Sequence, residues 1–198
     1  MIDTLCEQIE GNTVAVTWLY CDFLDAKEQT TVNIIGALVK QLVRVLGTVP
    51  TEINGAFVKA RREGRGLRVP DALKLLQATL GLLERTFICV DALDECPDKI
   101  LPELLSSLGA ISQGPSSVRL FITGRPHIQN VLDKYFSNGA QAIPISPNSG
   151  DIKEYLARAL REDLNFRAMD HALEAEIMEH IQEQISGVYA IAISISKA

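Results

Sequence analysis

Apolar and polar residues follow two different periods along this chain. Apolar residues recur every three or four positions over 32–46, which predicts an amphipathic helix with Thr30 and Thr31 at its N-cap. β-Branched and aromatic residues dominate 14–23, and a short apolar run bounded by polar residues occupies 86–91. Such a short run is typical of a strand buried on both faces of a parallel sheet.

The rest of the chain continues this alternation. Strands are predicted at 118–123 and 141–145, and further helices at 1–10, 51–62, 71–84, 97–111, 127–135, 151–163 and 169–185. Residues 187–196 alternate with period two, which favours a strand, whereas the neighbouring segments favour a helix, so both interpretations stay open. Strands that alternate with helices imply βαβ units and a mostly parallel sheet.

The predicted strands stop near Pro147, and helical spacing dominates after that point. We therefore expect an α/β domain at 1–147 and the start of a helical domain at 148–198. No internal repeat, heptad array or low-complexity tract is visible. The fold class that this pattern predicts is α/β, a mostly parallel sheet sandwiched between helices, followed by a helical segment.

Composition narrows the possible partners. The chain is 47% hydrophobic and 22% charged, as a folded globular protein is, and its net charge of −6 offers no field that attracts nucleic acid or anionic membranes. Its four cysteines form no C-x-x-C pair, and the sequence shows no signal peptide and no apolar run long enough to span a membrane. We expect a cytoplasmic protein without nucleic-acid or membrane partners.

The only basic patch, residues 61–68, contains two glycines but is expected to be a surface turn between helices. No strand precedes it and no Gly-Lys-Ser/Thr follows it, so it does not have the pattern of a phosphate loop.

Acidic residues gather directly after the predicted strand at 86–91. Asp91, Asp94 and Glu95 place three carboxylates within five positions, where they repel one another unless a cation or a proton relieves them. One interpretation is a solvated loop whose carboxylates favour the start of the next helix. The other is a Walker B motif, in which Asp91 faces Mg²⁺ and Asp94 or Glu95 handles a water molecule.

The next strand also ends in polar residues, Thr123 and Arg125. Because the carboxyl ends of parallel strands lie at one edge of a sheet, both loops are expected to face the same crevice. A nucleoside triphosphate site needs this combination: the metal bridges phosphate oxygens, an acid orients the attacking water, and the arginine steadies the γ-phosphate charge. Taken alone, Arg125 is better explained as a surface cation capped by Pro126, and the pair of loops in this order favours the joint interpretation.

Residues 87–96 (FICVDALDEC), followed by 120–126 (LFITGRP), resemble the NACHT-type signal-transduction NTPases of the STAND class. The likeness is strongest to the fungal, NLR-like members tied to ankyrin or WD repeats and to heterokaryon incompatibility. Residues 151–156 (DIKEYL) look like the aspartate-led helix after the sensor strand of that group, and 186–189 (SGVY) look like its later glycine-then-apolar segment.

The resemblance implies a three-layer P-loop NTPase fold that binds Mg²⁺ with ATP or GTP. In that family Asp91 helps to bind Mg²⁺ and Thr123 the nucleotide, Asp94 or Glu95 assists hydrolysis, and Arg125 is the sensor 1 arginine.

The sequence lacks the phosphate loop of this class, G-x-x-x-x-G-K-[ST], since none of its 13 glycines precedes a lysine. In the family, the strand before that loop lies between the Walker B side of the sheet and the last strand, so its loss is expected to leave two unpaired strand edges.

Three hypotheses remain open. The chain is a truncated piece of a longer NACHT ATPase, inactive alone. Or it is a naturally short, nucleotide-free module that docks on full-length NACHT relatives. Or it is a metal-dependent hydrolase that uses Asp91, Asp94 and Glu95 directly.

Overall fold

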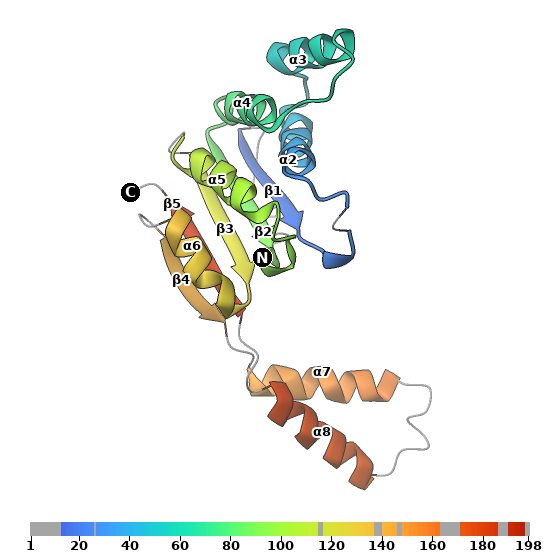
Figure 1. Cartoon of the computed structure of the whole chain (residues 1–198). Helices are drawn as coiled ribbons and strands as arrows, with labels where there is room; N and C mark the ends of the chain where they lie inside the picture. The colour runs from blue at the N-terminus through green and yellow to red at the C-terminus, as the bar shows by residue number, and fades with distance from the viewer. Residues whose placement is uncertain are drawn as a thin grey trace. The chain divides into compact units, whose positions relative to one another are not determined.

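Five strands form one sheet in the order β1-β2-β3-β5-β4 (Figure 1). Strands β1 (Val14–Tyr20), β2 (Arg85–Asp91) and β3 (Val118–Gly124) pair in parallel, with Ala15 opposite Thr86 and Val90 opposite Ile122. The consecutive residues Ile88, Cys89 and Val90 of β2 are all buried, so both faces of the central sheet are covered, as the short apolar run predicts. The α/β class and its layered architecture are confirmed.

The computed structural model describes residues 13–25, 27–114, 117–136, 140–145, 148–162, 171–185 and 190–196, so the helix predicted at 1–10 lies outside the described residues. The chain divides into two units, one formed by Met1–Ile143 with Ala192–Ala198 and the other by Pro144–Ile191. No helix in the described ranges has both the length and the apolar character that crossing a membrane requires.

Seven α-helices are described. The first unit contains α2 (Thr31–Leu46), α3 (Thr51–Arg62), α4 (Val69–Leu80), α5 (Leu101–Ser112) and α6 (Gln129–Tyr135), and the second contains α7 (Ser149–Glu162) and α8 (His171–Ile185). Short 3₁₀ turns follow β1, β2 and β3: η1 (Phe23–Asp25), η2 (Leu93–Glu95) and η3 (Pro126–Ile128). Helix α4 starts two residues before the predicted position 71 and ends at Leu80 instead of 84, since Gly81 and Leu82 close it with turn hydrogen bonds.

Helix α2 forms where its sequence predicts, because both of its ends carry local signals. The Thr30 hydroxyl accepts a hydrogen bond from the Asn33 N–H at 3.3 Å, and Gly47 ends the helix in the left-handed conformation with φ 68°. The apolar stripe of α2 is buried, with Ile35 and Leu42 fully enclosed. The helix therefore anchors the layer that covers β1.

The segment with period two is strand β5 (Ala190–Ser196), which resolves the ambiguity left by the sequence. It lies between β3 and β4 (Ala140–Ile145), and it runs opposite to β3, so the sheet is mixed (Figure 1). Its residues Ile193 and Ile195 are buried. The position that the resemblance leaves to a missing first strand is thus occupied, and the edge of β3 is paired.

Candidate functional site

The loops after β2 and β3 meet at the edge of the sheet where these parallel strands end, called the carboxyl edge below. The Thr123 hydroxyl donates a hydrogen bond to Oδ1 of Asp91 and accepts one from the Ala92 N–H at 3.1 Å. One threonine thus uses both its donor and its acceptor capacity to tie the acidic loop to the neighbouring strand. The parallel pairing of β2 with β3 brings these residues together, although 31 positions separate Ala92 from Thr123.

A second link joins the same two loops one turn further on. Both oxygens of Asp94 are held by Arg125: Oδ1 accepts from the backbone N–H at 3.1 Å, and Oδ2 lies 3.3 Å from the guanidinium Nε. The Asp94 side chain is only 6% exposed, whereas that of Arg125 is 71% exposed. The buried Asp94 carboxylate therefore positions Arg125, and most of the arginine side chain faces solvent.

Gly124 allows this close approach of the loops. A Cβ atom placed on Gly124 would lie 2.4 Å from Cδ1 of the buried Ile128 and 3.1 Å from Oδ1 of Asp94. Any side chain at this position would push Ile128 away or open the contact with Asp94, so a residue without a Cβ is needed here.

The acidic loop turns sharply because Ala92 adopts the left-handed conformation, with φ 52° and ψ 47°. This conformation costs a residue with a Cβ atom about 1–2 kcal/mol. The turn starts η2, in which the Glu95 N–H donates to the Ala92 carbonyl at 2.9 Å, and it buries the Leu93 side chain. Burial of Leu93 helps to offset the backbone strain and holds Asp91 and Asp94 toward β3.

The end of β1 adds a pair of cysteines that the sequence did not point to. The Cys21 N–H donates to the Asp91 carbonyl at 3.0 Å, and both Cys21 and Cys96 are buried free thiols. A hydrogen bond with Cys96, burial, and the negative charges of Asp91 and Asp94 raise the pKa of the Cys21 thiol far above its ordinary value. The same hydrogen bond lowers the pKa of Cys96. The Cys21 thiol thus stays protonated beside the carboxylates of Asp91 and Asp94.

Asp91 is the residue at this edge that is suited to bind Mg²⁺. Its Oδ2 makes no hydrogen bond or ion pair with any described residue, and Mg²⁺ is usually held by one or two carboxylates together with phosphates and water. Asp94 does not fit, because Arg125 occupies both of its oxygens. Within the described ranges no group of three or more His, Cys, Asp and Glu residues is arranged to hold a metal ion.

Glu95 stands apart from the network. Its side chain is half-exposed and forms no hydrogen bond or ion pair with the described part of the chain. Of the five residues singled out from the sequence, the structure joins four in two contacts, Asp91 with Thr123 and Asp94 with Arg125. It leaves Glu95 as the carboxylate without a partner.

The fold and the paired loops define an α/β domain with a polar site at the carboxyl ends of its parallel strands. The family model described as nephrocystin 3, N-terminal, matches residues 1–125, more than half of the chain and all of the site. The chain belongs to this family. Neither the curated proteins nor the solved structures contain a match.

Proposed function

We propose that this chain is part of a NACHT-type, STAND-class signalling NTPase, a molecular switch that responds to a bound nucleotide. The loops after β2 and β3 form the Walker B and sensor 1 side of its nucleotide site. One observation carries the proposal: two contacts, Asp91–Thr123 and Asp94–Arg125, join neighbouring parallel strands at the carboxyl edge. Ligands of open α/β sheets bind in the crevice at this edge.

The residues of the edge divide the work of binding and hydrolysis. Bound Mg²⁺ would neutralise part of the phosphate charge of ATP or GTP. Asp91 offers Oδ2 as a ligand, because the Thr123 hydroxyl holds its other oxygen. Asp94 engages Nε and the backbone N–H of Arg125 and leaves the terminal guanidinium nitrogens for the γ-phosphate. Glu95, the unpaired carboxylate, is then the group that orients the attacking water.

Hydrolysis also requires a phosphate loop, which these residues do not include. Strand β5 occupies the place beside β3 but runs in the opposite direction, so its C-terminal end lies away from Asp91 (Figure 1). The chain alone is therefore inactive in this proposal, and activity belongs to a longer protein in which G-x-x-x-x-G-K-[ST] precedes these residues. On the basis of the resemblance, we propose that this protein acts in fungal, NLR-like immune or heterokaryon-incompatibility signalling in the cytoplasm.

Nucleotide-dependent melting tests the proposal. With Mg-ATP or Mg-GTP, the Tm of the chain alone should not change, whereas the Tm of the protein extended by its upstream coding sequence should rise. Asp91→Asn in the extended protein should abolish the Mg²⁺-dependent part of that rise, and Lys153→Gln, an exposed residue of α7 in the other unit, serves as the control. An upstream sequence without Gly-Lys-Ser/Thr, or an extended protein whose Tm ignores nucleotide, would refute the proposal.

A second candidate is a nucleotide-free module that docks on full-length NACHT relatives. Strand β5 favours it, because the sheet is closed beside β3 without any strand that carries a phosphate loop. In this case the purified chain should bind an intact relative equally well with and without Mg-ATP. A rise in the Tm of the chain on adding Mg-ATP would contradict it.

A further inference from the structure

An apolar groove opens between α2, α3 and the loop that joins α3 to α4. Its volume is about 670 Å³, and Gly36 and Ala37 of α2, Phe57 of α3 and Leu67 of the loop contribute to its lining. We call it the α2–α3 groove. All of its lining residues lie between Val32 and Ala72, within the first unit.

Helix α3 forms one wall of the groove without belonging to the core. It buries none of its residues, and Phe57 is 62% exposed. Figure 1 shows α3 beyond the ends of α2 and α4, away from the sheet. Ile53, Phe57 and Ala60 nevertheless recur at helical spacing on one side, so α3 carries an apolar stripe, half-buried at Ile53 and Ala60, that the described residues cover only in part.

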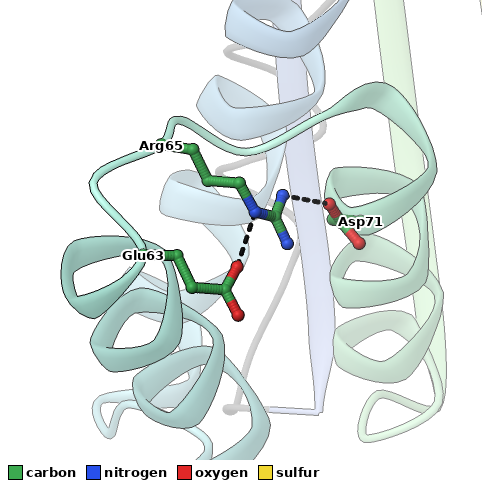
Figure 2. A network of polar contacts seen from close by, with 3 residues as sticks. All are labelled: Glu63, Arg65 and Asp71. Atoms are coloured by element: carbon green, nitrogen blue, oxygen red, sulfur yellow. Dashed lines mark hydrogen bonds and ion pairs between the residues drawn. The ribbon is translucent and has the colours of Figure 1, made fainter.

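An exposed network holds the loop beside the groove. Figure 2 shows Arg65 between the end of α3 and the start of α4: its Nε lies 2.6 Å from Oε2 of Glu63, and its Nη1 lies 3.5 Å from Oδ2 of Asp71. Glu63, and after it Asp71, raise the pKa of Arg65 above its ordinary value. These contacts neutralise Arg65 and define how the chain passes from α3 to α4.

Two other cations of the groove are not neutralised. Lys40 of α2 and Arg61 of α3 both line it, both are exposed, and neither forms an ion pair with any described residue. The whole chain carries a net charge of −6, so these two cations are a local exception to its acidic surface. An apolar surface flanked by unpaired cations is complementary to an apolar ligand that bears carboxylates.

The form of the groove favours a helix as the occupant over a small molecule. A pocket for a small ligand encloses most of the ligand's surface, whereas here Gly36, Ala37 and Phe57 are all exposed along open walls. A Cβ atom built on Gly36 would meet nothing within 4 Å, and small residues let another helix approach the backbone of α2 closely.

We propose that the α2–α3 groove binds an amphipathic helix of a partner protein whose apolar stripe is flanked by acidic residues. The stripe packs against Phe57, Ala37 and Leu67, and the flanking carboxylates pair with Lys40 and Arg61. This is the helix-in-groove mode of recognition, in which apolar side chains at i, i+3, i+4 and i+7 supply the contacts. The interaction does not depend on a nucleotide.

Two synthetic helical peptides of about 18 residues test the inference on the full chain by calorimetric titration. Both carry leucine at i, i+3, i+4 and i+7, and the flanking positions are glutamate in one peptide and lysine in the other. The glutamate peptide should bind saturably and at least about tenfold more tightly than the lysine peptide. Lys40→Glu with Arg61→Glu should reverse this preference, because the flanking charges then repel the glutamates.

Further variants separate the apolar contact from the charge. Phe57→Ser should weaken the binding of both peptides. Lys153→Glu reverses one charge on the exposed surface of α7, as each change of the double variant does in the groove, and should leave both affinities unchanged. Circular dichroism establishes that each variant is folded. Equal affinity for the two peptides, no binding, or an affinity unaffected by the double reversal would overturn the proposal. So would a clear preference of the groove for oleate or for phosphatidylglycerol vesicles over the glutamate peptide.

Discussion

The carboxyl edge and the α2–α3 groove use their charged residues in opposite ways. At the carboxyl edge the arginine is tied to a buried carboxylate, since Asp94 holds Arg125 at two atoms. In the groove, Lys40 and Arg61 have no ionic partner among the described residues, and Phe57 is left in solvent. Contacts within the fold pair the charges of the first region, whereas in the second region we propose that a bound helix does so.

This difference shows that a recognisable motif and an open binding surface need not coincide. The acidic loop stands out in the sequence, yet Asp91 and Asp94 bond to Thr123 and Arg125 of the next loop, and these contacts shape the edge. The groove has no motif, and only the exposure of its walls marks it. Four predictions test how strongly each region depends on its own contacts.

The largest effect should come from removing a buried side chain of the acidic loop. Leu93 is 1% exposed, so Leu93→Ala should lower the free energy of unfolding by about 2–5 kcal/mol. Phe57→Ala, on the exposed wall of the groove, should change it by less than about 0.5 kcal/mol. Urea denaturation measures both values. Equal losses would mean that α3 is packed as tightly as the acidic loop.

Removing the hydroxyl that links the two strands should cost less. Thr123→Val leaves the Ala92 N–H without an acceptor and Oδ1 of Asp91 without a donor, for a loss of about 1–3 kcal/mol. Thr123→Ser keeps the hydroxyl and should recover most of this loss. Equal destabilisation by serine and valine would show that the methyl group, not the hydrogen bonds, supports the edge.

Gly124→Ala should destabilise the fold by about 1–2 kcal/mol, because the new Cβ would lie 2.4 Å from Cδ1 of Ile128. Ile128→Val removes that methyl group, so adding it to Gly124→Ala should restore part of the stability. A double-mutant cycle from thermal unfolding gives the coupling between the two positions. Simple additivity would mean that the two side chains do not compete for space.

The smallest effect should be a gain at Ala92. Glycine adopts φ 52° without strain but loses more backbone freedom on folding, so Ala92→Gly should raise the free energy of unfolding by about 0.5 kcal/mol. Ala92→Val should lower it, because a β-branched side chain fits this conformation poorly. Denaturation curves of the three proteins give the order. Valine as stable as alanine would contradict the strain at this turn.

The elements that sequence predicted well are those whose signals are local. Helix α2 is bounded by Thr30 and Gly47, each next to the helix end that it caps, and its stripe repeats at a fixed spacing. Strand β5 remained ambiguous because its alternating residues fit two interpretations, and only pairing beside β3 decides between them. The expected parallel sheet is parallel through β1, β2 and β3 and becomes mixed at β5 (Figure 1). The direction of β5 could not be predicted either, because it too is decided by pairing beside β3.

The sequence by itself determined the alternation of strands and helices and the identity of the residues that follow β2 and β3, because periodicity, caps and strand ends are local properties of a chain. The tertiary structure decided which of those residues meet. The parallel order of the strands places Asp91 beside Thr123 and Asp94 beside Arg125, and the position of β1 adds Cys21. It also decided that α3, whose sequence is that of an ordinary amphipathic helix, buries no residue. Burial and pairing depend on distances between segments remote in sequence, and no local pattern records those distances.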